Sequence, residues 1–215
     1  MYLKGKVAVV TGAGRGIGKA IALAYAENGA CVVCAARTAL EIEQVAEEIQ
    51  EKGGKALVVQ TDVTDLESVK ALFKKSKEHF GGVDLLVINA GVNNDRNLVE
   101  ESDPQNWMDT INVNLIGAYN CAYSAIPYMK VHGGKIITIG SGRGHKGAQG
   151  GSAYACSKAG LWMLTRVLAQ ELWKYKISVN ELIPGPVNTS MDNNKKSNVF
   201  SIDSEWVKEP KDVTH

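Results

Sequence analysis

The sequence lacks any apolar run long enough to cross a membrane or to form the hydrophobic part of a signal peptide. It also lacks a surplus of charge of one sign, since 24 basic and 23 acidic side chains are spread along the chain and leave a net charge of +1. Neither a nucleic acid nor a membrane is therefore expected as a partner. With 215 residues, 45% of them hydrophobic, the chain is long enough for one domain with a sizeable core. We expect a soluble, cytoplasmic protein.

Cysteine is also scarce, at four residues. Cys31 and Cys34 form a C-x-x-C pattern, which in another context would indicate a redox or metal site. Their surroundings are apolar and strand-like, however, and a strand sends positions i and i+3 to opposite faces of its sheet. No second pair completes a metal site. We therefore expect buried strand residues, reduced thiols throughout the chain and no bound metal.

Short apolar runs alternate with longer amphipathic segments from end to end. Each run has the length of a buried strand, and most are rich in Val and Ile. This alternation predicts a three-layer α/β protein, in which helices cover both faces of a doubly wound parallel sheet. The predicted strands are residues 6–12, 30–36, 55–61, 84–90, 135–141 and 177–183.

Residues that favour helix starts lie between these runs. Thr38 with Glu41, and Thr64 with Glu67, have the spacing of a capping box. Glycines follow both of these helical segments. Pro104 suits the first turn of another helix.

The segment TGAGRGIG, residues 11–18, directly follows the first apolar run and opens a helix. Glycine permits a tight turn, a close approach of the backbone to a pyrophosphate, and close packing of the helix on the strand. The free N–H groups at the start of the helix favour a phosphate. A tight turn without a ligand is the alternative, but the position after the first strand favours a dinucleotide site.

The end of the second predicted strand is where many dinucleotide-binding folds carry an acidic residue that binds the ribose 2′-hydroxyl. Here Ala36 and Arg37 occupy that place, and Arg15 lies inside the glycine segment. Either arginine alone would be interpreted as a solvated surface charge. Together they indicate a site for a phosphate on the ribose.

Tyr154 and Lys158 are four residues apart, so both side chains leave one face of a predicted helix. With the glycine segment, this pair makes the sequence resemble the short-chain dehydrogenase/reductase family over about residues 5–191. TGAGRGIG is similar to the family's TGxxxGxG, and Tyr154 with Lys158 is similar to its YxxxK. The remaining matches are INAG (88–91, with Ile88 in place of the first Asn of NNAG), Asn114, Ser141 and PGPVNT (184–189, similar to PGxxxT).

The resemblance implies a Rossmann-type fold and a catalytic set of Asn114, Ser141, Tyr154 and Lys158. Tyr154 would give a proton to the carbonyl oxygen of the substrate as hydride arrives from the nicotinamide. The pKa of tyrosine is about 10, and an ammonium group one turn away would lower it toward the working pH. Lys158 would also hold the nicotinamide ribose, and Ser141 would hydrogen-bond the carbonyl oxygen. Asn114 would fix a water that links Lys158 to solvent.

The family also implies a nicotinamide dinucleotide as cofactor. Because of the two arginines, we expect NADP(H) to be preferred, with NAD(H) as the other option. Asp62 would bind the adenine, and residues 184–189 would edge the nicotinamide. The cofactor-binding residues predicted in this way are Gly12, Arg15, Gly16, Ile17, Gly18, Arg37, Asp62, Asn89, Gly91, Lys158, Pro184, Gly185, Val187 and Thr189.

Within the family, the sequence looks most like the 3-oxoacyl-carrier-protein reductases. The expected reaction is reduction of a 3-oxoacyl group or a related ketone, free or linked to a carrier, to a secondary alcohol. A sugar, polyol or steroid dehydrogenase of the same family and a non-catalytic dinucleotide-binding protein are the alternatives. In the loop 142–151, Arg143, His145 and Lys146 could attract an anionic substrate, although a solvated glycine-rich loop is the preferred interpretation.

Residues 1–191 are expected to form the dinucleotide-binding domain with the active site, and residues 192–215 the region of the substrate loop. The family continues with another helix and a seventh strand, so we expect a chain that is truncated or incompletely represented after its sixth strand. Apolar residues between Leu161 and Trp173 cover more than one helical stripe. This predicts a homodimer or homotetramer that uses this helix.

Overall fold

A computed structural model describes residues 1–187 and 208–214 of the chain. Its strands are β1 (Val7–Thr11), β2 (Cys31–Ala36), β3 (Lys55–Gln60), β4 (Leu85–Ile88), β5 (Gly134–Ile139) and β6 (Ile177–Leu182). All six predicted strands are confirmed, and they pair in parallel in the order β3-β2-β1-β4-β5-β6. The sheet is therefore the doubly wound one that the alternation of strands and helices predicted.

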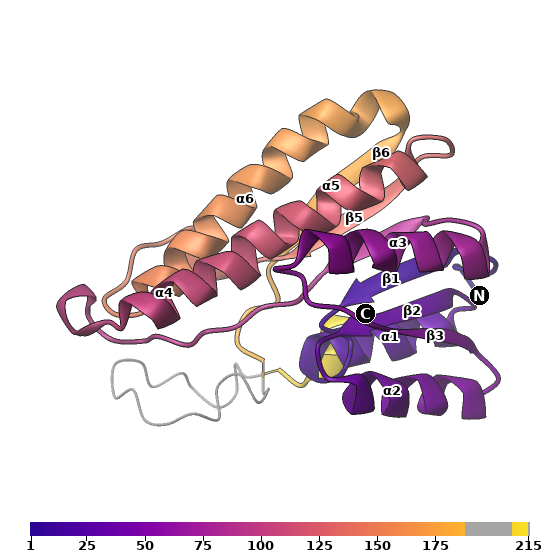
Figure 1. Ribbon diagram of the computed structural model, residues 1–215, viewed down its shortest axis with the longest axis horizontal. Helices are drawn as coiled ribbons and strands as arrows, with labels where there is room; N and C mark the ends of the chain where they lie inside the picture. Colours follow the sequence, from indigo (N-terminus) through magenta and orange to yellow (C-terminus); the bar gives the residue numbers. More distant parts are fainter. Residues whose placement is uncertain (188–207, 215) are drawn as a thin grey trace.

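The helices of the described residues are α1 (Gly16–Glu27), α2 (Ala39–Glu51), α3 (Leu66–Phe80), α4 (Pro104–Ile111), α5 (Gly117–Met129) and α6 (Ser152–Leu172), with a π-helical turn at Asn112–Ile116. In Figure 1, α1 and α2 lie below the sheet, whereas α3, α5 and α6 lie above it. The apolar cores agree with this view, because α3, α5 and α6 share one cluster and α1 and α2 share the other. The predicted three-layer architecture is confirmed.

The two cores explain why the strands are almost entirely apolar. Every residue of β1 and of β4 is buried, as expected where helices cover both faces of a parallel sheet. Cys31 packs against the core under α3, α5 and α6, whereas Cys34 belongs to the core under α1 and α2. The predicted placement of these cysteines on opposite faces is therefore confirmed.

The start of α2 differs from the prediction. Thr38 is the N-cap residue, but its side chain makes no capping hydrogen bond with the described residues. Glu41 lies against the glycine segment instead, and a Cβ atom built on Gly14 would be only 2.8 Å from its Oε2 atom. The predicted capping box does not form, and the carboxylate that should complete it lies against Gly14 instead.

The start of α3 also differs, by one residue. Asp65 rather than Thr64 is the N-cap, and its carboxylate accepts a hydrogen bond from the amide of Glu67 at 2.9 Å. Aspartate is at least as good a cap as threonine, and it lies next to Thr64 in the sequence. In α4 the prediction is confirmed, because Pro104 lies in the first turn, where Asp103 caps the helix.

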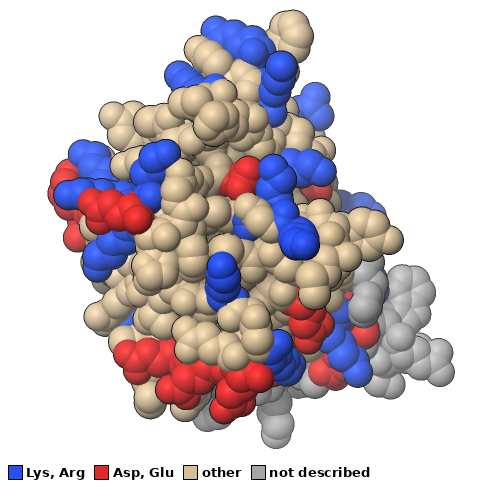
Figure 2. Space-filling model, turned by 90° about the vertical axis from the view of Figure 1, so that its right-hand side faces the viewer, with Lys and Arg blue, Asp and Glu red and all other residues tan. Residues whose placement is uncertain are grey.

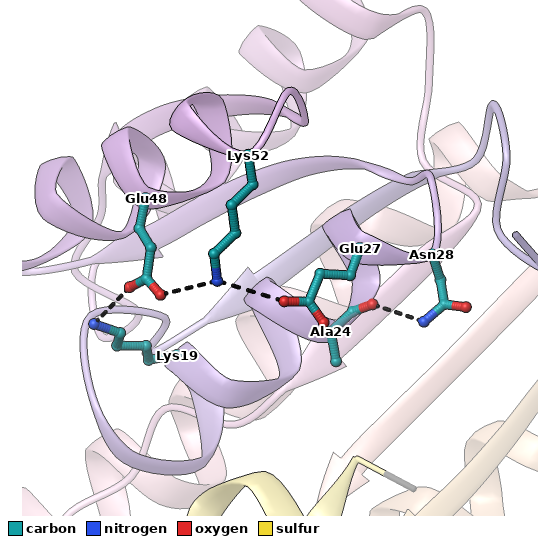
Figure 3. Close-up of polar contacts among 6 residues, drawn as sticks. All are labelled: Lys19, Ala24, Glu27, Asn28, Glu48 and Lys52. Atoms are coloured by element: carbon teal, nitrogen blue, oxygen red, sulfur yellow. Dashed lines mark hydrogen bonds and ion pairs between the residues drawn. The ribbon is translucent and has the colours of Figure 1, made fainter.

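The surface carries mixed charges that contribute little to stability. Figure 3 shows Lys52, the C-cap residue of α2, between Glu48 of α2 at 3.3 Å and Glu27 of α1 at 3.5 Å. Lys19 of α1 lies 3.0 Å from Glu48. The hydrogen bond from Lys19 is the main cause that lowers the pKa of Glu48. Exposed pairs of this kind contribute little to stability, because water and salt screen them. On the face drawn in Figure 2, basic and acidic side chains are interspersed, with a row of acidic ones at its lower edge.

Candidate active site

The predicted site residues gather at the edge of the sheet where the strands end. From β1 the chain proceeds outward to β2 and β3, and from β4 it proceeds to β5 and β6 on the other side. The strand order therefore reverses between β1 and β4, and ligands of open α/β sheets bind in the crevice outside such a point. The glycine segment follows β1, and the segment INAG ends β4.

The glycine segment packs closely against its neighbours at the start of α1, in places where a side chain would not fit. Gly12 and Gly16 have φ angles of 64° and 54°, which glycine adopts readily. A Cβ atom on Gly12 would lie 2.8 Å from the side-chain nitrogen of Asn89, and one on Gly18 would overlap the carbonyl oxygen of Gly12. Arg15 is the N-cap residue of α1, and its side chain makes no capping hydrogen bond with the described residues. The Arg15 side chain therefore accepts no hydrogen bond from the first N–H groups of the helix, including that of Ile17.

Thr11 and Asn89 join the ends of β1 and β4. The Thr11 hydroxyl donates to the carbonyl of Val87 at 3.2 Å and accepts from the amides of Asn89 and Ala90 at 3.0 and 3.1 Å. The Asn89 side chain donates to the carbonyl oxygens of Thr11 and Gly12 at 2.9 and 3.1 Å. Asn89, predicted to line the cofactor groove, thus also fixes the shape of the glycine segment.

The end of β2 carries no acidic side chain. Ala36 ends the strand, and the side chains of Arg37 and Arg15 are both exposed near this edge. Asp62 follows β3, and its Oδ1 atom accepts from the amide and the hydroxyl of Thr64 at 2.9 and 2.8 Å. Because they are exposed, Arg15 and Arg37 are both accessible to a ligand at this end of the site.

Lys158 and Tyr154 lie in the first turns of α6. Lys158 is only 5% exposed, and its ammonium donates to the carbonyl of Ile139, the last residue of β5, at 2.7 Å. The ammonium nitrogen is 5.7 Å from the centroid of the Tyr154 ring. Burial lowers the pKa of Lys158 to about 8, while the charge of Glu181 opposes this lowering. The group is therefore charged at neutral pH, but loses its proton only slightly above it.

Asn114 lies in the π-helical turn between α4 and α5, an irregularity that is frequent at functional sites. Its side chain accepts from the amide of Val92 at 2.8 Å and donates to the carbonyl of Val92 at 2.9 Å and to the hydroxyl of Ser157 at 3.0 Å. A Cβ atom on Gly91 would lie 3.2 Å from Asn114 Oδ1 and 3.8 Å from Lys158 Nζ. The fold thus brings three predicted site residues together.

Ser141 follows β5 and begins a 3₁₀ turn, Gly142–Gly144. Its hydroxyl accepts from the amide of Arg143 at 3.3 Å, and the Arg143 guanidinium donates to the carbonyl of Gly150 at 3.0 Å. The predicted solvated loop is thus ordered by its own contacts, although Lys146 is exposed.

The segment PGPVNT follows β6. Pro184, Gly185 and Val187 lie at the same edge of the sheet as the other strand ends, and Gly185 has a φ angle of 76°. Val187 forms a parallel bridge with Lys208. The predicted cofactor residue Thr189 lies outside the described residues.

A sequence model described as short chain dehydrogenase matches residues 6–199, which is most of the chain. The chain belongs to the short-chain dehydrogenase family. The resemblance found in the motifs is therefore confirmed.

Individual members of the family are similar over most of their length. A 3-oxoacyl-[acyl-carrier-protein] reductase, FabG, of Pseudomonas aeruginosa is 41% identical over 192 residues, which cover 89% of this chain and 77% of the relative. A protein of Thermotoga maritima named only as an uncharacterized oxidoreductase is 41% identical over 228 residues, covering 99% and 87%. A short chain dehydrogenase of Burkholderia cenocepacia, solved in complex with NADP, has a TM-score of 0.90 at 31% identity and covers 100% of this chain and 89% of that one.

As a short-chain dehydrogenase with such relatives, the protein is an NAD(P)-dependent dehydrogenase or reductase. The start of α1, where the N-cap residue Arg15 makes no capping hydrogen bond with the described residues, has the N–H groups that would suit a dinucleotide phosphate. None of the described helices has the length and apolar character needed to span a bilayer. Among the described residues, no three His, Cys, Asp or Glu side chains gather as metal ligands.

Sequence reasoning missed three polar residues of this short-chain dehydrogenase site. Thr11 and Ser157 are sequence neighbours of two predicted site residues, Gly12 and Lys158. Glu181 lies on β6 and acts on the charge of Lys158. The signal that could have found it is an acidic residue inside the predicted strand 177–183.

Proposed function

We propose that the protein uses NADP(H) to reduce a ketone, of the 3-oxoacyl type or a related one, to a secondary alcohol. The observation that carries this proposal is the buried Lys158 ammonium beside Tyr154, at the strand ends where the glycine segment also lies. A protein that only binds a dinucleotide has no need for such a pair. The 3-oxoacyl reductase among the similar proteins supports the substrate class.

The cofactor would lie along the strand ends. The start of α1 and the glycine segment would hold its pyrophosphate, and Asp62 its adenine. Residues 184–187, after β6, would border the nicotinamide. When bound, the reduced nicotinamide supplies a hydride to the carbonyl carbon.

Tyr154 would donate the proton that the carbonyl oxygen needs. The positive charge of Lys158 stabilises the phenolate that remains after the transfer, and so makes Tyr154 a better acid. The Ser141 hydroxyl accepts from the amide of Arg143, which leaves its own hydrogen free to bond the carbonyl oxygen. Asn114 lies next to Gly91 and Lys158 and would support the path by which Tyr154 regains a proton.

The preference for NADP(H) rests on charge at the adenine ribose. Ala36 offers no carboxylate to repel a 2′-phosphate, and Arg15 and Arg37 offer positive charge. Glu41 acts in the opposite direction, because its carboxylate lies against Gly14 in the glycine segment. Two arginines against one carboxylate leave a net attraction for the phosphate.

Assembly into a homodimer or homotetramer is part of the proposal. On α5 the side chains of Tyr119 and Tyr123 are 49% and 53% exposed, and on α6 those of Met163 and Val167 are 50% and 42% exposed. A second copy of the chain would cover this apolar surface. The cytoplasmic location stays a prediction.

A panel of carbonyl substrates tests the proposal. Oxidation of NADPH is followed with 3-oxoacyl thioesters, free 3-oxo acids, sugars, polyol-derived ketones and steroid ketones. We expect the highest kcat/KM with a 3-oxoacyl thioester. A higher kcat/KM with a sugar or steroid would contradict the substrate class, and no turnover with any carbonyl would contradict the proposed activity.

A further inference from the structure

Glu181 lies on β6 with its carboxylate turned to the buried face of the strand. Its neighbours on the same face of β6, Ile177 and Val179, are buried in the core. The side chain of Glu181 is 9% exposed, and among the described residues its Oε1 atom is buried without a hydrogen-bond partner. Its Oε2 atom is 3.0 Å from Nε2 of His145, whose ring lies 4.8 Å from that of Trp162 on α6. Burying a carboxylate is unfavourable unless its charge is compensated.

The carboxylate lies where three segments of the active site meet. A Cβ atom on Gly140, directly before Ser141, would overlap the carboxylate of Glu181. A Cβ atom on Gly144 would lie 2.6 Å from the carbonyl carbon of Lys158. The loop after Ser141, strand β6 and helix α6 are therefore packed together here. The Lys158 ammonium donates to the carbonyl of Ile139, and the next residue, Gly140, lies against the Glu181 carboxylate, so both charged groups lie at the end of β5.

We propose that Glu181 is a positioning residue, which holds the loop after Ser141 through His145 and serves as the buried counter-charge of the Lys158 ammonium. The inference rests on the proposed function, since Lys158 and Ser141 act there. An apolar side chain would fill the same place without the desolvation of a carboxylate. The charge is thus the feature that needs a role, and Lys158 supplies one.

The charge of Glu181 acts on Lys158 in a definite direction. It raises the pKa of Lys158, against the lowering that burial causes. Of the other titratable groups here, Tyr154 on α6 lies beside the ammonium, and His145 in the loop after Ser141 contacts the carboxylate of Glu181. Removal of the negative charge should therefore make Lys158 lose its proton at a lower pH.

The direct test is the titration of Lys158 by NMR in full-length protein with ¹³C-labelled lysine, where Lys158→Met assigns the signal. In Glu181→Gln we expect the midpoint to fall by about 1 pH unit, while Glu181→Asp, which keeps the charge, stays close to wild type. Glu171→Gln is the control, because it makes the same change at an exposed site on α6. Equal midpoints in Glu181→Gln and Glu171→Gln would overturn the role as counter-charge. This readout needs no substrate, so it is independent of the proposed function.

Kinetics test the contact with the loop. His145→Gln leaves the charge of Glu181 in place but weakens the hold on the loop, so we expect KM for the carbonyl to rise several-fold with an unchanged Lys158 titration. In Glu181→Gln we expect the basic limb of the pH profile of kcat/KM to move to lower pH together with the NMR midpoint. An unchanged KM in His145→Gln would contradict the role in holding the loop. If the wild-type protein reduced no carbonyl, the proposed function would be wrong. The NMR titration would still show whether Glu181 is the counter-charge of Lys158.

Discussion

Lys158 shows how the surroundings of one residue set its chemistry. An ammonium that is 5% exposed is poorly solvated, and burial lowers its pKa from 10.5 to about 8. A shift of this size corresponds to about 3 kcal/mol against the folded, charged state. The site thus keeps a group that destabilises the fold in exchange for a positive charge beside Tyr154.

Replacing this lysine should make the protein more stable. Lys158→Met removes the buried charge but also the hydrogen bond to Ile139, worth about 1 kcal/mol, so we expect a net gain of about 2 kcal/mol at pH 7. Because the folded-state pKa is the lower one, the cost is complete below pH 8 and disappears as the pH rises toward 10.5. Urea unfolding between pH 6 and 10 measures this, with the exposed Lys75→Met as control. If the gain in unfolding free energy did not decrease with rising pH, it would not come from the lowered pKa of Lys158.

Cofactor choice is also decided by single side chains. One partly exposed charge-assisted contact to a phosphate is worth roughly 1.5–3 kcal/mol, or about tenfold or more in selectivity. Arg37→Ala should lower the NADPH/NADH ratio of kcat/KM by at least about that factor, and Arg15→Ala by less. Glu41→Gln should raise the ratio, because it removes the negative charge that lies against the glycine segment. A wild-type ratio below one, or a ratio indifferent to Arg37, would contradict the preference for NADP(H).

Sequence patterns predicted the residues whose type and spacing are unusual, and missed those that act through contacts. Tyr154 and Lys158 stood out because a helix places them on one face. Glu181 was not predicted, and its contact with His145, 36 positions away, forms only because β6 packs against the loop. The role of Asn89 in joining β4 to β1 likewise depends on strand order, which spacing along the chain does not reveal.

Among the elements, the strands were easier to predict than the helix starts. A strand that is buried on both faces is mostly apolar, so a short run of apolar residues in the sequence indicates where it lies. A helix start depends on which of several neighbouring polar residues bonds the first amides. In α3 the N-cap residue is Asp65 and not its neighbour Thr64. In α2 the Glu41 side chain lies against Gly14 and makes no capping box.

The contact between β1 and α1 gives a prediction at the scale of elements. A methyl group at Gly18 would overlap the carbonyl oxygen of Gly12, so Gly18→Ala must push α1 away from the end of β1. Overpacking of this kind costs about 1–3 kcal/mol, and we expect NADPH binding to weaken at least tenfold. Gly82→Ala is a matched control, because nothing lies within 4 Å of its added methyl group. Calorimetric titration with NADPH measures the effect, and equal affinities in the two variants would contradict the close packing.

For the whole molecule, the exposed apolar surface of α5 and α6 predicts assembly. Light scattering at micromolar concentration should give a dimer or tetramer. Tyr123→Glu, in the exposed surface of α5, should shift the mass toward the monomer because it buries a charge in the interface. Val131→Glu, at an exposed apolar residue beyond the end of α5, should leave the mass unchanged. A monomeric wild type would contradict the assembly but leave the active site as described.

The central claim, that Tyr154 is the acid of a carbonyl reductase, is tested most directly by Tyr154→Phe. This change removes the hydroxyl and keeps the ring beside Lys158, so the fold and the cofactor site stay intact. With the best substrate of the panel, kcat should fall by roughly a hundredfold or more, while the dissociation constant for NADPH stays within about twofold of wild type. Turnover at nearly the wild-type rate, with NADPH bound equally well, would show that Tyr154 is not the acid.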